Sequence, residues 1–590
     1  MAIKKLTALL LSAGLICTTA VCGCTVKETY LNSNSSSASE AASQSASDDG
    51  SLALPEDGGF KTVDYKLTDR SDKYRTYYEI FPYSFCDSNG DGIGDFKGIT
   101  SKLDYLNDGD TKTTDDLGIE GIWLMPIMPS PSYHKYNVID YRSIDENYGT
   151  MDDFKEFLEE AHKRNINVII DLVVNHTSRQ NEWFVKAKQE LKEGKTDGYA
   201  DYYHFKKDMS GEKGWRSLGF DNWYYEGQFD DDMPDLNLQN EKVRKEIEDI
   251  AKYWIDIGVD GFRLDAVLWF EYPDADGSIE DLKWFHDYVD SIKKDAFVVG
   301  ECWENSATIE RFYNSQIDSF FDFDEQGSTG RVARAIKSKN AKSYVEGIQA
   351  WQKRITDANK NAINTPFISN HDTGRSAGFL TDDYARKLAA ALYILSPGNS
   401  FIYYGEEIAM EGGANDPDKR KGMYWSATDK TGFVPSIPGE TNDDVPEKGV
   451  DELQKDDNSL LNFYKRIIAL KNQNPEIKNG KATAVTFSDE TKEVAGYVME
   501  ADGSKVFVLF NAADYAMKVE VPEDSFKISE VRGYAIAGAE EKTESSGAAD
   551  DLFAVAAPSE EVKKSDIEAD NFTVNGQEVI LPARSVIILK

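Results

Sequence analysis

The stretch Gly261-Phe262-Arg263-Leu264-Asp265-Ala266 follows an amphipathic segment that ends in Gly258-Val259-Asp260. We predict that it is one strand of a barrel of alternating strands and helices, in which the chemistry sits at the carboxyl ends of the strands. Side chains alternate along a strand, so Arg263 and Asp265 are expected on the same face. The guanidinium would then hold the carboxylate ionised, the state that a nucleophile needs. Taken alone, the same pair also fits a buried salt bridge without a catalytic role.

Around this run, strand-like and helix-like segments alternate from about residue 75, the pattern of a parallel sheet wrapped by helices. A helix is predicted over 151–164. The apolar run that follows it is typical of a strand buried on both faces. Eight strands are expected, the number that closes a TIM barrel, and they span residues 77–82, 121–125, 166–174, 259–265, 296–300, 317–321, 365–369 and 400–404. The predicted class is therefore α/β, with a (β/α)8 barrel.

Two further parts accompany the barrel. An aromatic and polar stretch after the third strand is too long for an ordinary loop and predicts an inserted subdomain. Beyond the last barrel helix, short apolar or alternating stretches without helices predict a C-terminal all-β sandwich. The expected organisation is a lipoprotein signal peptide (1–23), a Ser/Ala-rich tether (24–60), the barrel (61–175 and 239–478), the insert (176–238) and the β domain (479–590).

The amino terminus indicates the compartment. Lys4 and Lys5 precede an apolar run over 6–21 that is too short for a permanent membrane span and is typical of a secretory signal. The run closes with Val21-Cys22-Gly23-Cys24, which resembles a bacterial lipobox with Cys24 as the lipidated residue, although Cys22 is unusual at its position. The Ser-rich segment that follows suits a flexible tether. We expect a secreted protein that a lipid on Cys24 holds at the extracellular face of the cell membrane.

The amino-acid composition excludes some classes of binding partner. The formal net charge of −38 argues against nucleic acid and against a polybasic membrane patch. We expect a monomer.

Outside the signal region, the chain has only two cysteines, Cys86 and Cys302, which excludes a disulfide scaffold. Two buried free thiols are expected, and a single bridge between them stays open.

Three carboxylates each follow a short apolar strand: Asp265, Glu301 and Asp372. Their spacing corresponds to about one and then about two strand–helix units, which predicts that they face the same mouth of the barrel. Two carboxyl groups across a glycosidic bond suffice for hydrolysis, one as nucleophile and one as an acid with a raised pKa. The third can stabilise the positive charge that develops on the sugar.

Four segments carry a resemblance to a known family, and they occur in the family's order: 171–176 (DLVVNH), 261–265 (GFRLD), 300–303 (GECW) and 369–372 (SNHD). They resemble the four consensus regions of the α-amylase family, glycoside hydrolase family 13. The flanking segments 121–126 and 401–407 also match. The resemblance extends from about residue 75 to the end of the chain. It implies a retaining α-glucan hydrolase with α-glucan as its partner, and we favour an α-amylase acting on α-1,4 bonds of starch and maltooligosaccharides.

The resemblance also implies roles for the residues in these motifs. Asp265 would be the nucleophile, Glu301 the acid/base and Asp372 the transition-state stabiliser. Arg263 would keep Asp265 charged, and Asp171 would be a support rather than a catalyst. Substrate-binding roles fall on the histidines and the tyrosine of matched segments, namely His134, Tyr136, His176 and His371.

Three positions bear on specificity. Relatives that are oligo-1,6-glucosidases carry Asp where His134 stands, which favours α-1,4 substrates here. The segment 233–237 (MPDLN) combines a Met typical of neopullulanases with a Pro-Asp-Leu-Asn typical of oligo-1,6-glucosidases. This mixture resembles the subfamily that is intermediate between these two groups of enzymes. Typical α-amylases have a Lys-His pair that contacts aglycone sugars and calcium where this chain has Leu268 and Trp269. The leaving-group preference and that calcium site therefore stay open.

A different segment predicts a structural calcium ion. The sequence Asp87-Ser-Asn89-Gly-Asp91-Gly-Ile93-Gly-Asp95 alternates oxygen ligands around a glycine-rich turn, the chemistry that a hard cation needs. It lacks the Glu of an EF-hand and resembles the family's loop after the first strand. There, side chains of the four polar residues and the carbonyl of Ile93 would bind Ca²⁺. The alternative is an ordinary surface turn.

Other functions remain open from the sequence. Neopullulanase, α-glucosidase and transglycosylase specificities use the same residues. A surface glycan-binding lipoprotein with an inactive barrel is the alternative from another class. The presence of all three carboxylates argues against it, since a barrel that only binds need not retain them.

Overall fold

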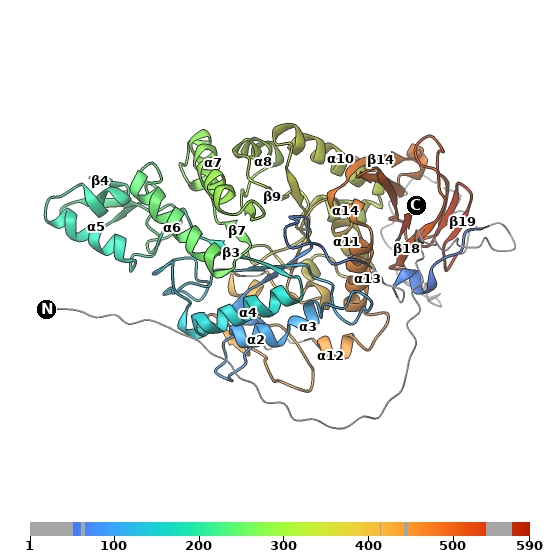
Figure 1. Cartoon of the computed structure of the whole chain (residues 1–590), viewed down its shortest axis with the longest axis horizontal. Helices are drawn as coiled ribbons and strands as arrows, with labels where there is room; N and C mark the ends of the chain where they lie inside the picture. Colours follow the sequence, from blue (N-terminus) through green and yellow to red (C-terminus); the bar gives the residue numbers. More distant parts are fainter. Residues whose placement is uncertain (1–50, 61–64, 414, 442–445, 539–568) are drawn as a thin grey trace, which may run out of the picture. The chain divides into compact units, whose positions relative to one another are not determined.

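The computed structural model describes residues 51–60, 65–413, 415–441, 446–538 and 569–590 (Figure 1). The predicted signal peptide, the lipidation site Cys24 and the tether up to residue 50 lie outside these ranges. Along the described ranges, no helix combines the length and the apolar character needed to cross a membrane.

An eight-stranded parallel sheet forms the barrel, in the order β10-β9-β8-β7-β3-β2-β1-β11. Its strands are β1 Tyr77–Ile80, β2 Gly121–Leu124, β3 Asn167–Leu172, β7 Gly261–Leu264, β8 Phe297–Gly300, β9 Ser319–Phe321, β10 Ile363–Thr365 and β11 Phe401–Tyr403. Two backbone hydrogen bonds join the outer strands β10 and β11, from Asn399 N to Asn364 O (2.8 Å) and from Phe401 N to Pro366 O (3.0 Å). The sheet therefore nearly closes on itself, and the predicted TIM barrel is confirmed.

One predicted strand is displaced. The seventh strand was expected over 365–369, and the structure has it at Ile363–Thr365. Pro366 lacks an N–H and cannot donate to the ladder, so the strand ends before it. The residues that follow form a buried loop, which carries the chain to Asp372 at the mouth of the barrel.

Helices alternate with the strands, and several of the longer ones are amphipathic and bury one apolar stripe. Their bounds are α1 Pro82–Phe85, α2 Phe96–Ser101, α3 Leu103–Leu106, α4 Met151–Lys163, α6 Glu241–Ile257, α7 Ala275–Ile292, α8 Ser306–Phe312, α9 Arg331–Ser338, α10 Ala341–Ala358, α11 Asp383–Ile394, α12 Val450–Leu453, α13 Leu460–Gln473 and α14 Pro475–Asn479. Helix α4 begins at a capping box of Thr150 with Asp153, and the Asn240 side chain caps α6. The packed helices leave all eight strands buried on both faces, as the apolar runs predicted.

The opening residue of β7 has to be glycine. A Cβ atom at Gly261 would lie 2.0 Å from the carbonyl oxygen of Phe297 on the neighbouring strand β8. No side chain fits so close to a backbone atom. The close approach sets the register of β7 against β8, and so places Arg263 opposite Val299.

The insert after β3 is confirmed as a small antiparallel subdomain. It contains α5 Glu182–Lys192 and the strands β4 Phe205–Lys207, β5 Trp215–Ser217 and β6 Trp223–Glu226, in the order β4-β6-β5. Isolated bridges tie the two ends of the insert together, His176 with Asp235 and Tyr203 with Leu236. These bridges bring the insert back to the end of β3, next to the mouth of the barrel.

The C-terminal part is all-β, as predicted. One antiparallel sheet has the order β14-β15-β16-β21-β18 and a second has β17-β20-β19. Their bounds are β14 Lys481–Thr486, β15 Val494–Ala501, β16 Ser504–Asn511, β17 Met517–Glu520, β18 Val531–Ile536, β19 Thr573–Asn575, β20 Glu578–Leu581 and β21 Ser585–Leu589. A separate apolar core that includes Phe507, Val519 and Leu581 draws on both sheets. A two-residue hairpin, β12 Ser436–Ile437 with β13 Glu440–Thr441, lies in the loop after β11.

Candidate active site

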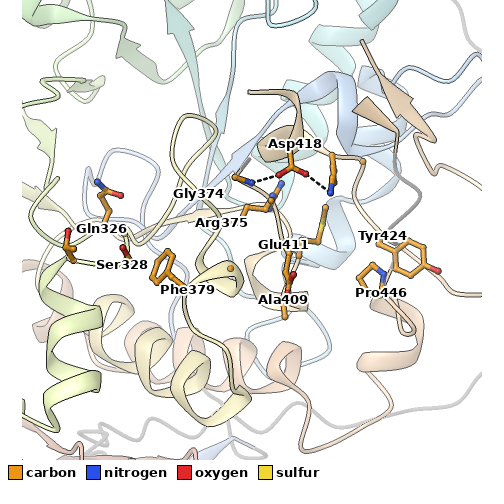
Figure 2. Close-up of a pocket in the computed structure, with 18 residues that line it drawn as sticks. Gln326, Ser328, Gly374, Arg375, Phe379, Ala409, Glu411, Asp418, Tyr424 and Pro446 are labelled. Atoms are coloured by element: carbon orange, nitrogen blue, oxygen red, sulfur yellow. Dashed lines mark hydrogen bonds and ion pairs between the residues drawn. The ribbon is translucent and has the colours of Figure 1, made fainter. Parts of the chain in front are cut away.

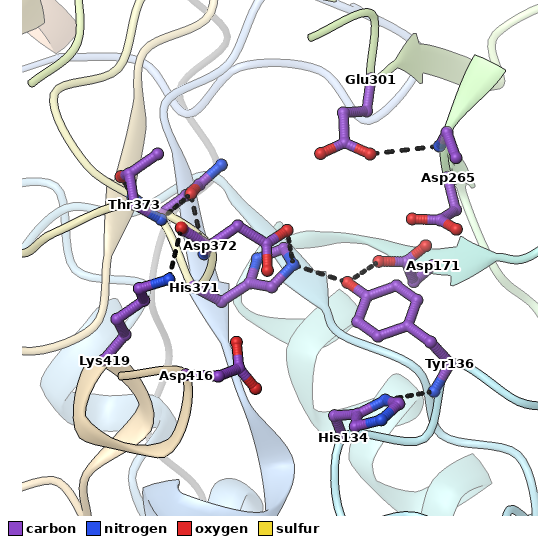
Figure 3. Close-up of polar contacts among 12 residues, drawn as sticks. His134, Tyr136, Asp171, Asp265, Glu301, His371, Asp372, Thr373, Asp416 and Lys419 are labelled. Atoms are coloured by element: carbon purple, nitrogen blue, oxygen red, sulfur yellow. Dashed lines mark hydrogen bonds and ion pairs between the residues drawn. The ribbon is translucent and has the colours of Figure 1, made fainter. Parts of the chain in front are cut away.

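The carboxyl ends of the barrel strands surround a cavity of about 400 Å³. Figure 3 shows Asp265, Glu301 and Asp372, which lie at this end of the barrel. Asp265 follows β7, Glu301 follows β8, and Asp372 lies in the loop after β10. The structure brings all three predicted carboxylates to this cavity. Its lining also includes His134, Tyr136, His176, Phe229, Asp230, Met233, Ala266, Leu268, Trp269, Trp303, Asp416 and Arg420.

Arg263 joins the carboxylates beneath the cavity. Its Nη1 lies 2.8 Å from Asp265 Oδ1 and 2.9 Å from Asp171 Oδ2, and its Nη2 lies 2.9 Å from Glu301 Oε2. The predicted pairing of Arg263 with Asp265 on one face is confirmed. The guanidinium is 1% exposed, so its interactions are little screened by water. It forms an ion pair with the nucleophile candidate and positions the acid candidate beside it.

Glu301 is set up to carry a proton. Burial raises the pKa of its carboxyl group to about 7; Arg263 opposes this, and the negative charges of Asp265 and Asp372 add to it. The backbone N–H of Ala266 donates to Glu301 Oε2 at 3.1 Å and fixes the carboxyl group (Figure 3). A carboxyl group that is partly protonated near neutral pH suits a general acid that later acts as a base.

Asp372 has the opposite electrostatic setting. Burial alone raises the pKa of its carboxyl group, but the adjacent His371 and Arg420 outweigh burial, and the net pKa lies well below the usual range. Arg420 Nη2 lies 2.8 Å from Oδ1, and His371 Nε2 lies 2.9 Å from Oδ2. Asp372 therefore stays ionised while Glu301 holds its proton.

The predicted sugar-binding residues fall into two groups. His134, Tyr136 and His176 line the cavity, where they can reach a sugar. Burial lowers the pKa of His134 to about 4 and also lowers that of His176, so both rings are neutral hydrogen-bonding groups near neutral pH. His371 instead lies fully buried behind Asp372, and both of its ring nitrogens face protein oxygens. Its contact with sugar stays a prediction.

Asp171 is a support, as its motif suggested. Its side chain is fully buried and accepts hydrogen bonds from Arg263 and from the hydroxyl of Tyr136 (2.9 Å). It does not belong to the lining of the cavity. Trp269 and Trp303, by contrast, both line the cavity, and Trp303 is half-exposed.

Sequence reasoning missed Asp416 and Arg420, which come from the long loop after β11. Asp418 stabilises this loop: it accepts a hydrogen bond from Gly413 N and forms an ion pair with Lys421, both at 2.6 Å (Figure 2). A larger cavity of about 1010 Å³ lies against this loop, and none of the three carboxylates lines it. No local motif marks Arg420, since its role depends on a loop fold that brings it to Asp372.

The predicted calcium loop lies between β1 and α2. Asp87 accepts hydrogen bonds from the backbone N–H groups of Asn89, Gly90 and Gly92, and Asp95 accepts from Gly98 N. Throughout the described ranges, no group of three or more His, Cys, Asp or Glu side chains converges as metal ligands. The carboxylates of this loop are thus engaged by the backbone.

Cys86 and Cys302 are both buried and free. The expectation of two free thiols is confirmed, and the alternative of a bridge between them is wrong.

A (β/α)8 barrel that gathers a guanidinium-held carboxylate pair and a third ionised carboxylate at its mouth defines a glycoside hydrolase. Residues 79–480 match the family profile described as "Alpha amylase, catalytic domain". The chain therefore belongs to the α-amylase family.

Individual relatives agree with this assignment. The chain is 35% identical over 447 residues to Alpha-amylase 3 of Dictyoglomus thermophilum, covering 74% of this chain and 85% of that one. It is 29% identical to the oligo-1,6-glucosidase of Parageobacillus thermoglucosidasius, covering 76% and 92%. Among solved structures, Eubacterium rectale Amy13B matches with a TM-score of 0.76 and 38% identity over 90% of this chain and 97% of that one. An α-amylase from H. orenii matches with a TM-score of 0.71 and 33% identity over 88% and 99%.

Proposed function

We propose that the protein is an extracellular retaining α-amylase that cleaves α-1,4-glucosidic bonds of starch and maltooligosaccharides. The observation that carries the proposal is the guanidinium of Arg263, which holds Asp265 at 2.8 Å and Glu301 at 2.9 Å within one cavity. The names of the relatives support the substrate class, since those at 35% and 38% identity include a protein named as an α-amylase. His134 in place of Asp supports α-1,4 over α-1,6 bonds.

The geometry supports a double displacement. Asp265 attacks the anomeric carbon, while protonated Glu301 gives its proton to the oxygen of the leaving sugar. The glycosyl unit is then bonded to Asp265, and Glu301 is a carboxylate. Glu301 next removes a proton from water, whose oxygen attacks the same carbon and releases Asp265. Asp372, held ionised by His371 and Arg420, stabilises the positive charge of both transition states.

A product profile tests the substrate class. We expect the purified protein to release maltooligosaccharides from soluble starch and to act on maltotriose, while isomaltose remains intact. Chromatography of the digests of starch, pullulan, isomaltose and maltotriose checks this. Rapid cleavage of isomaltose would favour an oligo-1,6-glucosidase, preferred cleavage of pullulan a neopullulanase, and no turnover of any of them an inactive glycan-binding barrel.

We also propose that the loop at 87–95 holds a structural calcium ion. The donor set fits a hard cation, since it consists only of oxygen atoms: the side chains of Asp87, Asn89, Asp91 and Asp95 and the carbonyl of Ile93. Among the described residues, none of these three carboxylates forms an ion pair with Lys or Arg. Each accepts hydrogen bonds from backbone N–H groups, and a bound cation would supply the positive charge that the loop lacks. No residue of this loop lines the cavity that holds the carboxylates of the reaction, and the ion would stabilise the fold.

Chelation tests this site. A bound ion stabilises the folded state by mass action, so EGTA is expected to lower the melting temperature by a few degrees, and added Ca²⁺ to restore it. Differential scanning calorimetry measures the change. In an Asp91→Ser variant the melting temperature should no longer respond to EGTA. An unchanged melting temperature of the wild-type protein in EGTA would contradict the proposal.

For the localisation we propose lipidation of Cys24 and attachment to the extracellular face of the membrane. The support is the sequence pattern alone: a short apolar signal, a lipobox-like end and a Ser-rich tether. Expression of the full chain in a bacterial host with labelled fatty acid should label the wild-type protein and leave a Cys24→Ser variant unlabelled. Equal labelling of both would exclude Cys24.

A further inference from the structure

His371 lies between two carboxylates from distant parts of the chain. Its Nδ1 is 2.6 Å from Oε1 of Glu79 on β1, and its Nε2 is 2.9 Å from Oδ2 of Asp372. The histidine is 0% exposed and Glu79 is 1% exposed. Glu79 does not line the catalytic cavity, so it reaches the reaction only through His371.

The hydrogen-bond partners of the ring bear on its protonation state. A neutral imidazole carries one proton and can donate to one carboxylate, while its other nitrogen would present a lone pair to the second. The hydroxyl of Tyr136 also lies 2.8 Å from His371 Nε2, but its proton is donated to Asp171 Oδ2 at 2.9 Å (Figure 3). The Tyr136 oxygen is therefore an acceptor toward the ring. Both ring nitrogens thus face oxygen atoms, an arrangement in which an imidazolium can donate from both.

Other groups around the ring agree with a positive charge. Burial lowers the pKa of His371, yet Asp372 and Glu79 outweigh burial and raise it to about 9. The ring of Tyr136 stacks on it at 5.6 Å, and the edge of Trp123 packs against it. The nearest cation, Arg420, donates through Nε to the carbonyl oxygen of His371 and through Nη2 to Asp372. Arg420 and the His371 ring thus both contact Asp372, and Glu79 offsets the positive charge of the ring.

We propose that Glu79 is a positioning residue of the reaction, which holds His371 charged and oriented so that Asp372 stays ionised and aimed at the sugar. Without the charge of Glu79, a buried imidazolium would share the single carboxylate of Asp372 with Arg420. The ring would then lose its proton more easily, and its Nε2 would turn from a donor into a lone pair facing Asp372. The catalytic role of Glu79 rests on the proposed hydrolysis of glucan.

An NMR titration tests the electrostatic step without substrate. The chain has six histidines, so ¹⁵N-labelled imidazole signals are few enough to assign with a His371→Gln variant. In the wild-type protein we expect His371 to show two protonated nitrogens at pH 7. In Glu79→Gln, which keeps the shape and the acceptor oxygen but removes the charge, the titration should move to lower pH. Glu79→Asp, which keeps the charge, should retain the doubly protonated ring. A neutral His371 in the wild-type protein, or an unchanged titration in Glu79→Gln, would overturn the inference.

Kinetics on starch test the catalytic step. The ratio of wild-type kcat to that of Glu79→Gln should rise roughly tenfold from pH 5 to pH 7, as the variant loses its imidazolium, while KM stays nearly the same. Glu407→Gln is the matched control. Glu407 is also a fully buried glutamate of the barrel, but it accepts hydrogen bonds from Tyr78 and Tyr105 and does not contact His371. Its ratio should not change with pH. A ratio for Glu79→Gln that is constant with pH would indicate a purely structural role.

The two experiments separate the inference from the proposed function. A protein that hydrolyses starch but keeps the same His371 titration in Glu79→Gln contradicts the inference alone. A protein that turns over no glucan while Glu79 still controls the charge of His371 contradicts the proposed function, and with it the catalytic role of Glu79.

Discussion

Replacing Asp265 by Asn is expected to reduce hydrolysis of soluble starch by about 10⁴-fold or more, a loss typical of a nucleophile that acts in a concerted set. The amide cannot form the glycosyl ester. Without this intermediate, the double displacement cannot proceed. The fold should persist, because Arg263 keeps Asp171 and Glu301 as partners, both at 2.9 Å. Initial rates of reducing-sugar release and the melting temperature measure the two effects.

A control for this variant lies at the other end of the same strand. Asp260 precedes β7 and binds Arg70, His162 and Lys293, far from the mouth of the barrel. Asp260→Asn should lower the melting temperature and leave kcat near that of the wild-type protein, because this end of a barrel serves stability. Undiminished starch hydrolysis by Asp265→Asn, or an equal loss in both variants, would exclude Asp265 as the nucleophile.

Replacing Glu301 by Gln should produce the second large effect, a loss of about 10²–10⁴-fold on starch. The amide cannot give a proton to the departing sugar. In kcat/KM, which reports the steps up to the glycosyl-enzyme, the loss should be far smaller on α-glucosyl fluoride, because fluoride leaves without protonation. The loss in kcat should persist, because Glu301 is also the base that activates water. Comparison of the two substrates therefore separates loss of the acid from loss of the fold.

The pH dependence gives an independent check on Glu301. The group acts in its protonated form during cleavage, and burial raises its pKa to about 7. Wild-type kcat/KM is thus expected to fall as pH rises through about 7, where Glu301 loses its proton. In Glu301→Gln that fall should disappear with α-glucosyl fluoride. An unchanged fall in the variant would assign it to another group.

Much of the fold could be predicted from local patterns. The run at 261–266 is apolar, opens with a glycine that no other residue can replace, and ends with Arg263 and Asp265 on one face. These features depend only on residues that are adjacent in sequence, so they can be predicted from the sequence. The seventh strand was misplaced by two residues because the apolar pattern continues past Pro366, while the missing N–H of that proline ends the ladder.

The site was only partly predictable. Asp265 and Glu301 directly follow strands, and Asp372 lies in the loop after β10. A barrel brings these carboxyl ends together, so the meeting of the three carboxylates follows from the alternation of strands and helices. Arg420 has no such position: its loop after β11 has no periodic pattern, and only its folded course brings the guanidinium to Asp372. Glu79 is the one charged residue in the apolar strand Tyr77–Ile80, which weakly indicates a special role. Its partner His371 is distant in sequence, so no local pattern identifies it.

The order of amino acids specifies the kinds of chemical groups and the order in which the barrel presents them. Their charge states depend on the folded arrangement. Arg263 reaches Asp171, 92 residues away, and Glu79 reaches His371, 292 residues away. The pKa of a buried group depends on its loss of water and on the charges around it, and both are set by segments that meet only when the chain folds. For this reason candidates for the nucleophile, the acid and the stabiliser could be named from motifs, whereas the raised pKa of Glu301 and the proposed charge on His371 depend on the folded protein.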